Sequence, residues 1–157
     1  MKNETKVERK SERELVVTRT FDAPARIVYE AWTKPDLMKR WWVPKSFGIT
    51  MVSCDMDVRS GGSYRLVFGG EKLKEPMAFF GKYLEVTAGA RLVWTNEEAP
   101  DGAVTTATFE EQNGKTFVTV RDLFPSKEAL DAQIASGATS GTAQVHAQLD
   151  ELLATLT

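Results

Sequence analysis

The chain has 157 residues, of which 42% are hydrophobic and 27% are charged, and this length suits one domain better than two. Its 20 basic and 22 acidic residues give a formal charge of -2, which argues against a nucleic-acid partner because phosphate binding usually needs a basic surplus. No apolar run approaches the roughly 20 residues that cross a bilayer, so no membrane partner is expected. The single cysteine, Cys54, cannot form a disulfide within the chain, which favours a reducing, cytoplasmic location.

The N-terminal part of the sequence divides into a polar segment, a strand and two short helices. Residues 1–13 mix basic and acidic side chains without an apolar period, which predicts a flexible segment ahead of a single domain at 14–157. Within that domain, Glu14–Phe21 is rich in β-branched residues and predicts the first strand. Pro24 suits the first turn of a short helix. A second short helix is expected to end before Pro44, since proline cannot continue a helix.

From Ile49 onwards the hydrophobic period changes to two, which is typical of strands. Six strands are predicted, at 50–58, 63–68, 77–86, 92–97, 103–111 and 116–124. Short turns join them, and Asn113-Gly114 is the strongest hairpin signal because a type I′ turn needs positive φ at both central residues. With the first strand, this meander predicts a seven-stranded antiparallel sheet. For the strand at 77–86 the pattern does not decide which face points inward, because each face carries a phenylalanine.

The C-terminal part returns to a helical period. A helix is predicted at 127–135, followed by a long terminal helix whose apolar stripe is formed by Val145, Leu149, Leu152 and Leu156. A curled antiparallel sheet and one amphipathic helix can bury each other's apolar faces, but a single helix does not fill the whole concave face. We therefore expect an α+β fold in which a curved seven-stranded antiparallel sheet, two short helices and a long C-terminal helix enclose a cavity.

Several segments resemble a known family. The stretch RTFDAPARIVYEAWTKPDLMKRWWVP (19–44) resembles the opening of AHSA-type domains, which are similar to the C-terminal domain of the activator of the heat-shock-protein ATPase. Further matches are DVRSGGSY, GKYLEV, RLVWT and LDELL, at 57–64, 81–86, 91–95 and 149–153. The resemblance places the chain in the START-like, or SRPBCC, superfamily and implies a helix-grip fold. Members of that superfamily include lipid and hormone carriers, aromatase/cyclases and co-chaperone domains, and fold alone does not choose among these functions.

Strand and helix parity indicates which side chains face the expected cavity. The apolar candidates for ligand contact are Tyr64, Leu66, Phe68, Phe79, Trp94, Phe109, Val120, Phe124, Val145 and Leu149. For any one of them the alternative is an ordinary core side chain, because large aromatic residues stabilise a fold with or without a ligand. As a group, they indicate a cavity wall.

Two polar residues complete the set of candidate ligand contacts. Asp122 shares the parity of the inward side chains of its strand, so it is a ligand anchor or half of a structural ion pair with an arginine: Arg65, Arg91 or Arg121. His146 lies one position from the apolar stripe, so it faces the cavity or the solvent. No catalytic residue is assigned, and one histidine with one cysteine does not suffice for a typical zinc site, so neither a metal nor a cofactor is expected.

The favoured function is the binding of a small apolar or aromatic molecule in an internal cavity. The alternatives are a small-molecule enzyme of the cyclase or hydrolase kind, using Asp122, Tyr64 or His146, and a co-chaperone-like interaction domain. A homodimer is a further expectation, either through the sheet face or through the corner at Trp41-Trp42, because two adjacent tryptophans exceed what one short helix readily covers.

Overall fold

The helices and strands follow the predicted order, and the computed structural model describes them over residues 4–71, 73–100, 102–137 and 141–156. The strands are β1 (Lys6–Arg9), β2 (Glu14–Phe21), β3 (Thr50–Met56), β4 (Ser63–Gly69), β5 (Met77–Thr87), β6 (Arg91–Thr95), β7 (Val104–Gln112) and β8 (Lys115–Leu123). The helices are α1 (Ala25–Thr33), α2 (Pro35–Met38), the 3-10 helix η1 (Lys45–Phe47), α3 (Lys127–Ala135) and α4 (Thr142–Leu156). None of the described helices combines the length and the apolar character needed to cross a membrane.

All described strands form one antiparallel sheet in the order β1-β2-β8-β7-β6-β5-β4-β3. The α+β class is confirmed, but the sheet has eight strands where seven were predicted. The additional strand, β1, comes from the segment 1–13 that was expected to be flexible, whose first three residues lie outside the described ranges. It pairs with the outer edge of β2 through backbone hydrogen bonds. All four of its residues are exposed, so apolar periodicity carried no signal for it.

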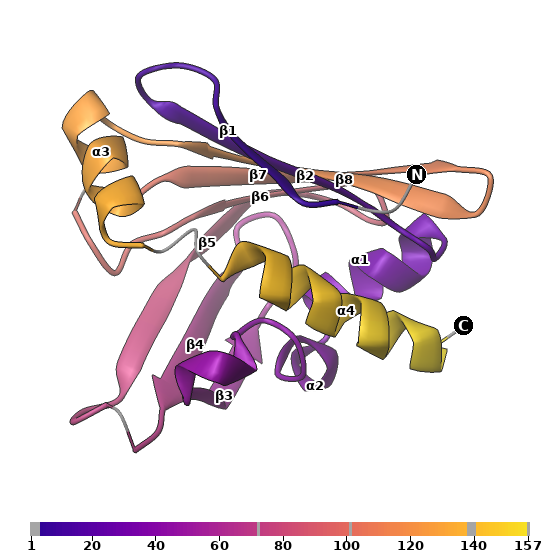
Figure 1. Cartoon of the computed structure of the whole chain (residues 1–157), viewed down its shortest axis with the longest axis horizontal. Coiled ribbons are helices and arrows are strands. Elements are labelled where there is room, and N and C mark those ends of the chain that lie inside the picture. The colour runs from indigo at the N-terminus through magenta and orange to yellow at the C-terminus, as the bar shows by residue number, and fades with distance from the viewer. Residues whose placement is uncertain (1–3, 72, 101, 138–140, 157) are drawn as a thin grey trace.

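Strand β5 bends and thereby belongs to two parts of the sheet. Residues 77–82 pair with β4, whereas residues 83–87 pair with β6. A register shift between Tyr83 and Glu85 marks the bend, as expected for a bulge that increases local twist. In consequence, β3, β4 and the first half of β5 turn away from the layer of β1, β2, β8, β7 and β6 (Figure 1).

The same bulge explains why the sequence pattern did not decide which face of β5 points inward. Phe79 and Tyr83 face inward ahead of the bend, whereas Phe80 and Leu84 are 41% and 53% exposed. Beyond the bend, Val86 packs against the core. A shift of one residue exchanges the two faces of a strand, so no single alternation could describe the whole of β5.

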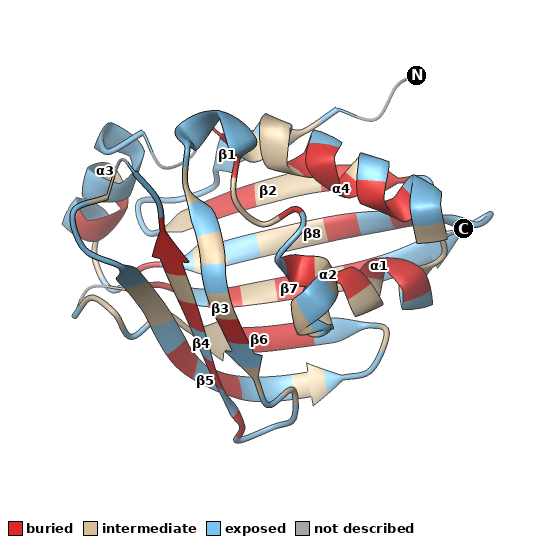
Figure 2. Cartoon of the chain, turned by 90° about the horizontal axis from the view of Figure 1, so that it is seen from below, coloured by how far each residue is buried: buried red, intermediate tan, exposed pale blue. Residues whose placement is uncertain are grey.

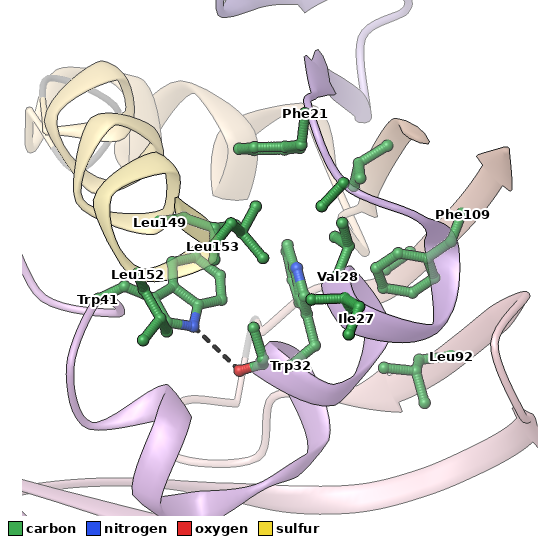
Figure 3. Packing of buried hydrophobic residues seen from close by; sticks show 14 residues of the cluster. Phe21, Ile27, Val28, Trp32, Trp41, Leu92, Phe109, Leu149, Leu152 and Leu153 are labelled. Atoms are coloured by element: carbon green, nitrogen blue, oxygen red, sulfur yellow. Dashed lines mark hydrogen bonds between the residues drawn. The ribbon is translucent and has the colours of Figure 1, made fainter. Parts of the chain in front are cut away.

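Helices α1 and α4 lie across the concave face of the sheet, and both carry buried residues (Figure 2). The main core joins both helices to the sheet (Figure 3). Its largest members are Phe21, Ile27, Val28, Trp32, Trp41, Leu92, Phe109, Leu149, Leu152 and Leu153. Burying each such side chain stabilises the fold by about 1.5–3 kcal/mol relative to exposure, so this layer holds the helices on the sheet.

The buried face of α4 is rotated from the predicted stripe. Val145 and Leu156 are only partly buried, whereas Gln148 and Leu153 are buried beside Leu149. Gln148 explains the rotation, because its side-chain Nε2 donates to two main-chain carbonyls, those of Trp41 at 3.0 Å and Val43 at 2.9 Å. A buried amide needs such partners, and it anchors the chain after α2 to α4.

Trp41 is buried and Trp42 is partly buried, so the pair does not form an exposed corner. Trp41 is 1% exposed, and its indole nitrogen donates to the carbonyl oxygen of Ala31 at 2.9 Å (Figure 3). Trp42 packs between the main core and a second hydrophobic cluster under β3 and β4. The expectation of an exposed Trp41-Trp42 surface was therefore wrong, because α4 supplies the apolar cover that the short helices lack.

His146 is buried on α4, near the N-terminal end of the described chain. Its Nδ1 lies 2.7 Å from the hydroxyl oxygen of Thr5, and its ring meets Phe21 edge-on at 5.3 Å. Burial lowers the pKa of His146 to about 4, the Arg19 guanidinium adds to this effect, and the Asp150 carboxylate opposes it. Arg19 and Asp150 hold each other through two hydrogen bonds, of 2.8 and 2.5 Å. His146 is therefore neutral in the folded protein near neutral pH.

We predict that His146 makes stability depend on pH between about 6.5 and about 4, the pKa values of the free and the folded histidine. In this window the unfolded chain binds a proton that the folded chain does not, so the free energy of unfolding falls as the pH falls. The contribution of neutral His146 to the free energy of unfolding is fully present above pH 6.5, and up to about 3 kcal/mol of it is lost by pH 4. Denaturant titrations of the wild type and of His146→Gln across this range should give a flatter profile for the variant. Parallel profiles would contradict the prediction.

We also predict that Gly81→Ala strongly destabilises the bend in β5. A Cβ atom at this position would overlap the carbonyl oxygen and the hydroxyl of Thr95, and such overpacking typically costs about 1–3 kcal/mol. The matched control is Lys82→Ala, at the adjacent exposed position, for which a change within about 0.5 kcal/mol is expected. Equal midpoints of denaturation for the two variants would show that the strand accommodates a side chain at the bend.

Candidate functional site

A cavity lies where the bent sheet faces α1 and α2, and we call it the central cavity. Six aromatic side chains line it: Trp32, Trp42, Tyr64, Phe79, Tyr83 and Trp94. The remaining lining residues are Met38, Met56, Leu66, Leu92 and Asn96. Ligand sites are commonly apolar and aromatic with few polar groups, and this lining has that character.

The central cavity is small in this conformation, with a volume of about 60 Å³. A water molecule needs roughly 10–15 Å³ on such a scale, whereas an engineered cavity of about 150 Å³ accepts benzene. The central cavity thus has room for a few waters but not for an aromatic ring. Entry of a larger molecule requires a lining side chain to move.

Trp32 lies at the centre of the aromatic packing. Its ring centroid is 5.0 Å from Trp41, 5.5 Å from Trp42, 6.3 Å from Trp94 and 5.7 Å from Phe109. Among the described residues, its buried indole nitrogen has no hydrogen-bond partner. An unpaired buried donor costs about 1–3 kcal/mol, so this indole nitrogen is a destabilising feature of the core.

A chain of polar groups leads from the central cavity to Asp122. The hydroxyl of Tyr64 donates to the carbonyl oxygen of Thr95 at 2.6 Å and lies 3.4 Å from Oδ1 of Asn96. The Nδ2 of Asn96 donates to the hydroxyl of Thr105 at 2.9 Å. That hydroxyl in turn donates to Oδ1 of Asp122 at 2.6 Å. Each threonine hydroxyl can donate once and accept twice, so the sequence of bonds is chemically consistent.

Asp122 lies on the wall of a second hollow, of about 300 Å³, which we call the Asp122 hollow. It is formed by the loop between β6 and β7, the ends of β7 and β8, and α3. Phe79 and Asn96 line both the central cavity and the Asp122 hollow. Burial raises the pKa of the Asp122 carboxyl, and the hydrogen bond from Thr105 offsets this only in part.

The arginines considered as partners for this carboxylate bind elsewhere. Arg91 pairs with Glu85 at 3.0 Å, Arg121 pairs with Glu14 at 3.4 Å, and Arg65 is exposed. Arg121 neighbours Asp122 in the same strand and so points to the other face of the sheet. The residue directly across from Asp122 in the register is Thr105, which is the partner that strand pairing selects.

The predicted contact residues fall into three groups. Tyr64, Leu66, Phe79 and Trp94 line the central cavity. Asp122 and Phe124 line the Asp122 hollow. The third group lies in packed structure away from both spaces and consists of Phe68, Phe109, Val120, Val145, His146 and Leu149.

Phe109 and Leu149 belong to the main core, where side chains from the helices fill the concave face. Phe68 packs on Phe79 with ring centroids 5.0 Å apart. His146 contacts Thr5 and Phe21 and lines neither space.

Several lining residues were not predicted. Trp32, Met38 and Trp42 come from α1, α2 and the chain after it, and their positions depend on how the helices pack on the sheet. An inward helical face could have suggested Trp32. Asn96 follows the end of β6, and no periodicity distinguishes it from other turn residues.

Comparison with known proteins identifies relatives over nearly the whole chain. The family model described as "Activator of Hsp90 ATPase homolog 1-like protein" matches residues 22–154. Curated proteins give no match.

Solved structures share the fold. A protein from Rhodobacter sphaeroides is 23% identical with a TM-score of 0.89, covering 98% of this chain and 100% of its own. The Mycobacterium smegmatis protein Ms6760 is 25% identical with a TM-score of 0.81, covering 98% and 99%. An AHSA1-like protein from Aeromonas hydrophila is 18% identical with a TM-score of 0.66, covering 87% and 94%. Since its family model spans residues 22–154, the chain belongs to the family of Activator of Hsp90 ATPase homolog 1-like proteins.

Proposed function

We propose that this protein binds a small apolar or aromatic molecule in the central cavity. The observation that carries the proposal is the lining, in which six of the eleven residues are aromatic and Asn96 is the one amide. Aromatic side chains offer a ligand large apolar contact areas and edge or face geometries. A lining of this kind, placed between a bent sheet and two helices, is the usual setting of a ligand site.

The small volume of the cavity bears on the mechanism of binding. Because about 60 Å³ is less than an aromatic ring requires, the ligand replaces waters and displaces a side chain. Met38 and Met56 line the cavity, and methionine is the side chain that adapts its shape most readily. Binding therefore selects a more open conformation than the one described.

Support for binding rather than acid–base catalysis comes from three polar residues. His146 is held by Thr5 outside both spaces. Burial raises the pKa of the Tyr64 hydroxyl, so it remains a neutral donor near neutral pH. Asp122 accepts from Thr105, and among the described residues it has no histidine partner with which to share a proton.

We predict that a small aromatic probe such as indole raises the melting temperature in proportion to the logarithm of its concentration, because it binds the folded state alone. At a hundred times its Kd the gain in the free energy of unfolding is about 2.7 kcal/mol. In Met56→Trp the larger side chain occupies the cavity. The apparent affinity for indole, obtained from the shift in melting temperature, should therefore fall at least tenfold. Differential scanning calorimetry measures both proteins.

The matched control is Met77→Trp, which adds the same ring at a residue that is 41% exposed and outside the cavity lining. Its response to indole should equal that of the wild type. A melting temperature that does not respond to indole or to a panel of similar rings would overturn the proposal.

A further inference from the structure

The Asp122 hollow carries a negative charge without a described counter-charge. Its lining contains two carboxylates, Asp122 and Glu98, and no lysine or arginine among the described residues. Glu98 is partly engaged, because its Oε1 accepts from the main-chain nitrogen of Phe80 at 3.2 Å. Arg13 donates to the carbonyl oxygen of Phe124 at 2.8 Å and is not part of the lining.

Asp122 is partly buried in the wall of the hollow, and its carboxylate has no cationic partner among the described residues. Within the described part of the chain it accepts one hydrogen bond, from the hydroxyl of Thr105 at 2.6 Å, whereas a carboxylate has about four acceptor positions. A buried charge is normally paired, because desolvation penalises it. The neutral hydroxyl of Thr105 supplies only part of that compensation.

The Asp122 hollow adjoins the central cavity. Phe79 and Asn96 line both spaces, and the hydrogen bonds from Asn96 to Thr105 and from Thr105 to Asp122 lead from their shared wall into the hollow. A molecule that moves part of this shared wall would contact both spaces at once. Its apolar end would meet the aromatic lining, and its polar end would meet a carboxylate.

We infer that the natural ligand is an amphipathic amine, with an apolar or aromatic body in the central cavity and an ammonium group in the Asp122 hollow against the Asp122 carboxylate. This inference rests on the proposed function and specifies its ligand class. A carboxylate only accepts hydrogen bonds, so it favours a charged donor. The rings of Phe79 and Phe124, which line the same hollow, also favour a cation over a neutral group.

Other ligand classes fit these surroundings less well. An anionic head group would face Asp122 and Glu98, and like charges in a partly desolvated site repel each other. A hydrocarbon could enter the central cavity, but the Asp122 carboxylate would then remain without a cationic partner. We therefore expect the affinity of the ligand to be highest with an amine head group, lower for a plain hydrocarbon and lowest with a carboxylate.

Three matched series of probes test this inference on the full chain. They are ω-phenylalkylamines with two to five methylenes, the alkylbenzenes of the same lengths, and the corresponding ω-phenylalkanoates. We expect the best amine to bind at least tenfold more tightly than its alkylbenzene, and the alkanoate to bind more weakly than either. Isothermal titration calorimetry supplies the affinities at pH 7.

Asp122→Asn should lower the affinity for the best amine to that of the alkylbenzene while leaving the alkylbenzene affinity within twofold. The control is Asp55→Asn, which removes the same charge from an exposed position on β3. It should preserve the preference for the amine. This control separates a specific contact from a change in net charge.

A second readout follows the carboxylate itself. The pKa of Asp122, which burial raises in the free protein, should fall when the amine binds and stay constant when the alkylbenzene binds. Carbon-13 NMR of the aspartate carboxyls in the unaltered chain measures this shift. It decides the question even if Asp122→Asn does not fold.

The possible results separate the two proposals. If no member of any series binds, the proposed function fails and the ligand class with it. If alkylbenzenes bind but amines bind no more tightly, or if the amine leaves the pKa of Asp122 unchanged, the ligand class is overturned and the proposed function stands.

Discussion

The structure depends on the bend in β5. Up to Lys82 this strand pairs with β4, and from Tyr83 it pairs with β6. A single bent strand therefore connects the two parts of the sheet, which run in different directions. At the bend the main chain of Gly81 lies directly against Thr95, which leaves no room for a Cβ atom. This close approach brings β4 toward β6 across the corner. Without it, the sheet would be an open layer with helices on one face and no enclosed space beneath α2.

The bend also explains where polar groups are tolerated in an apolar interior. The carbonyl oxygen of Thr95, held against Gly81, accepts the hydroxyl of Tyr64 from the facing strand. Asn96 and Thr105 continue this line of hydrogen bonds to Asp122. Polar side chains on inward positions thus find partners between the central cavity and the Asp122 hollow. The lining of the central cavity itself is mainly aromatic.

The central cavity and the Asp122 hollow differ in chemical character, since the first is mainly aromatic and the second contains two carboxylates. Membership in the AHSA1-like family and the likeness to solved structures account for the sheet and its helices, but fold does not determine the molecule that is bound. Under the proposed function, that choice depends on local chemistry, above all on the carboxylate of Asp122, which has no cationic partner among the described residues. A ligand that supplies a cation there would gain affinity because the free protein leaves this interaction unmade.

The sequence by itself determined the order of the elements, the antiparallel meander and the inward parity of residues such as Tyr64, Leu66 and Trp94, because periodicity and turn chemistry are local. It missed β1, whose exposed residues have no apolar period, and it named Phe109 and Leu149 as ligand contacts, whereas both are members of the main core. Only the tertiary structure decided which inward side chains meet empty space. The bulge in β5 brings Tyr83 to the central cavity, and the packing of the helical segment on the sheet brings Trp32 and Trp42 there. Both depend on contacts between residues far apart in the chain.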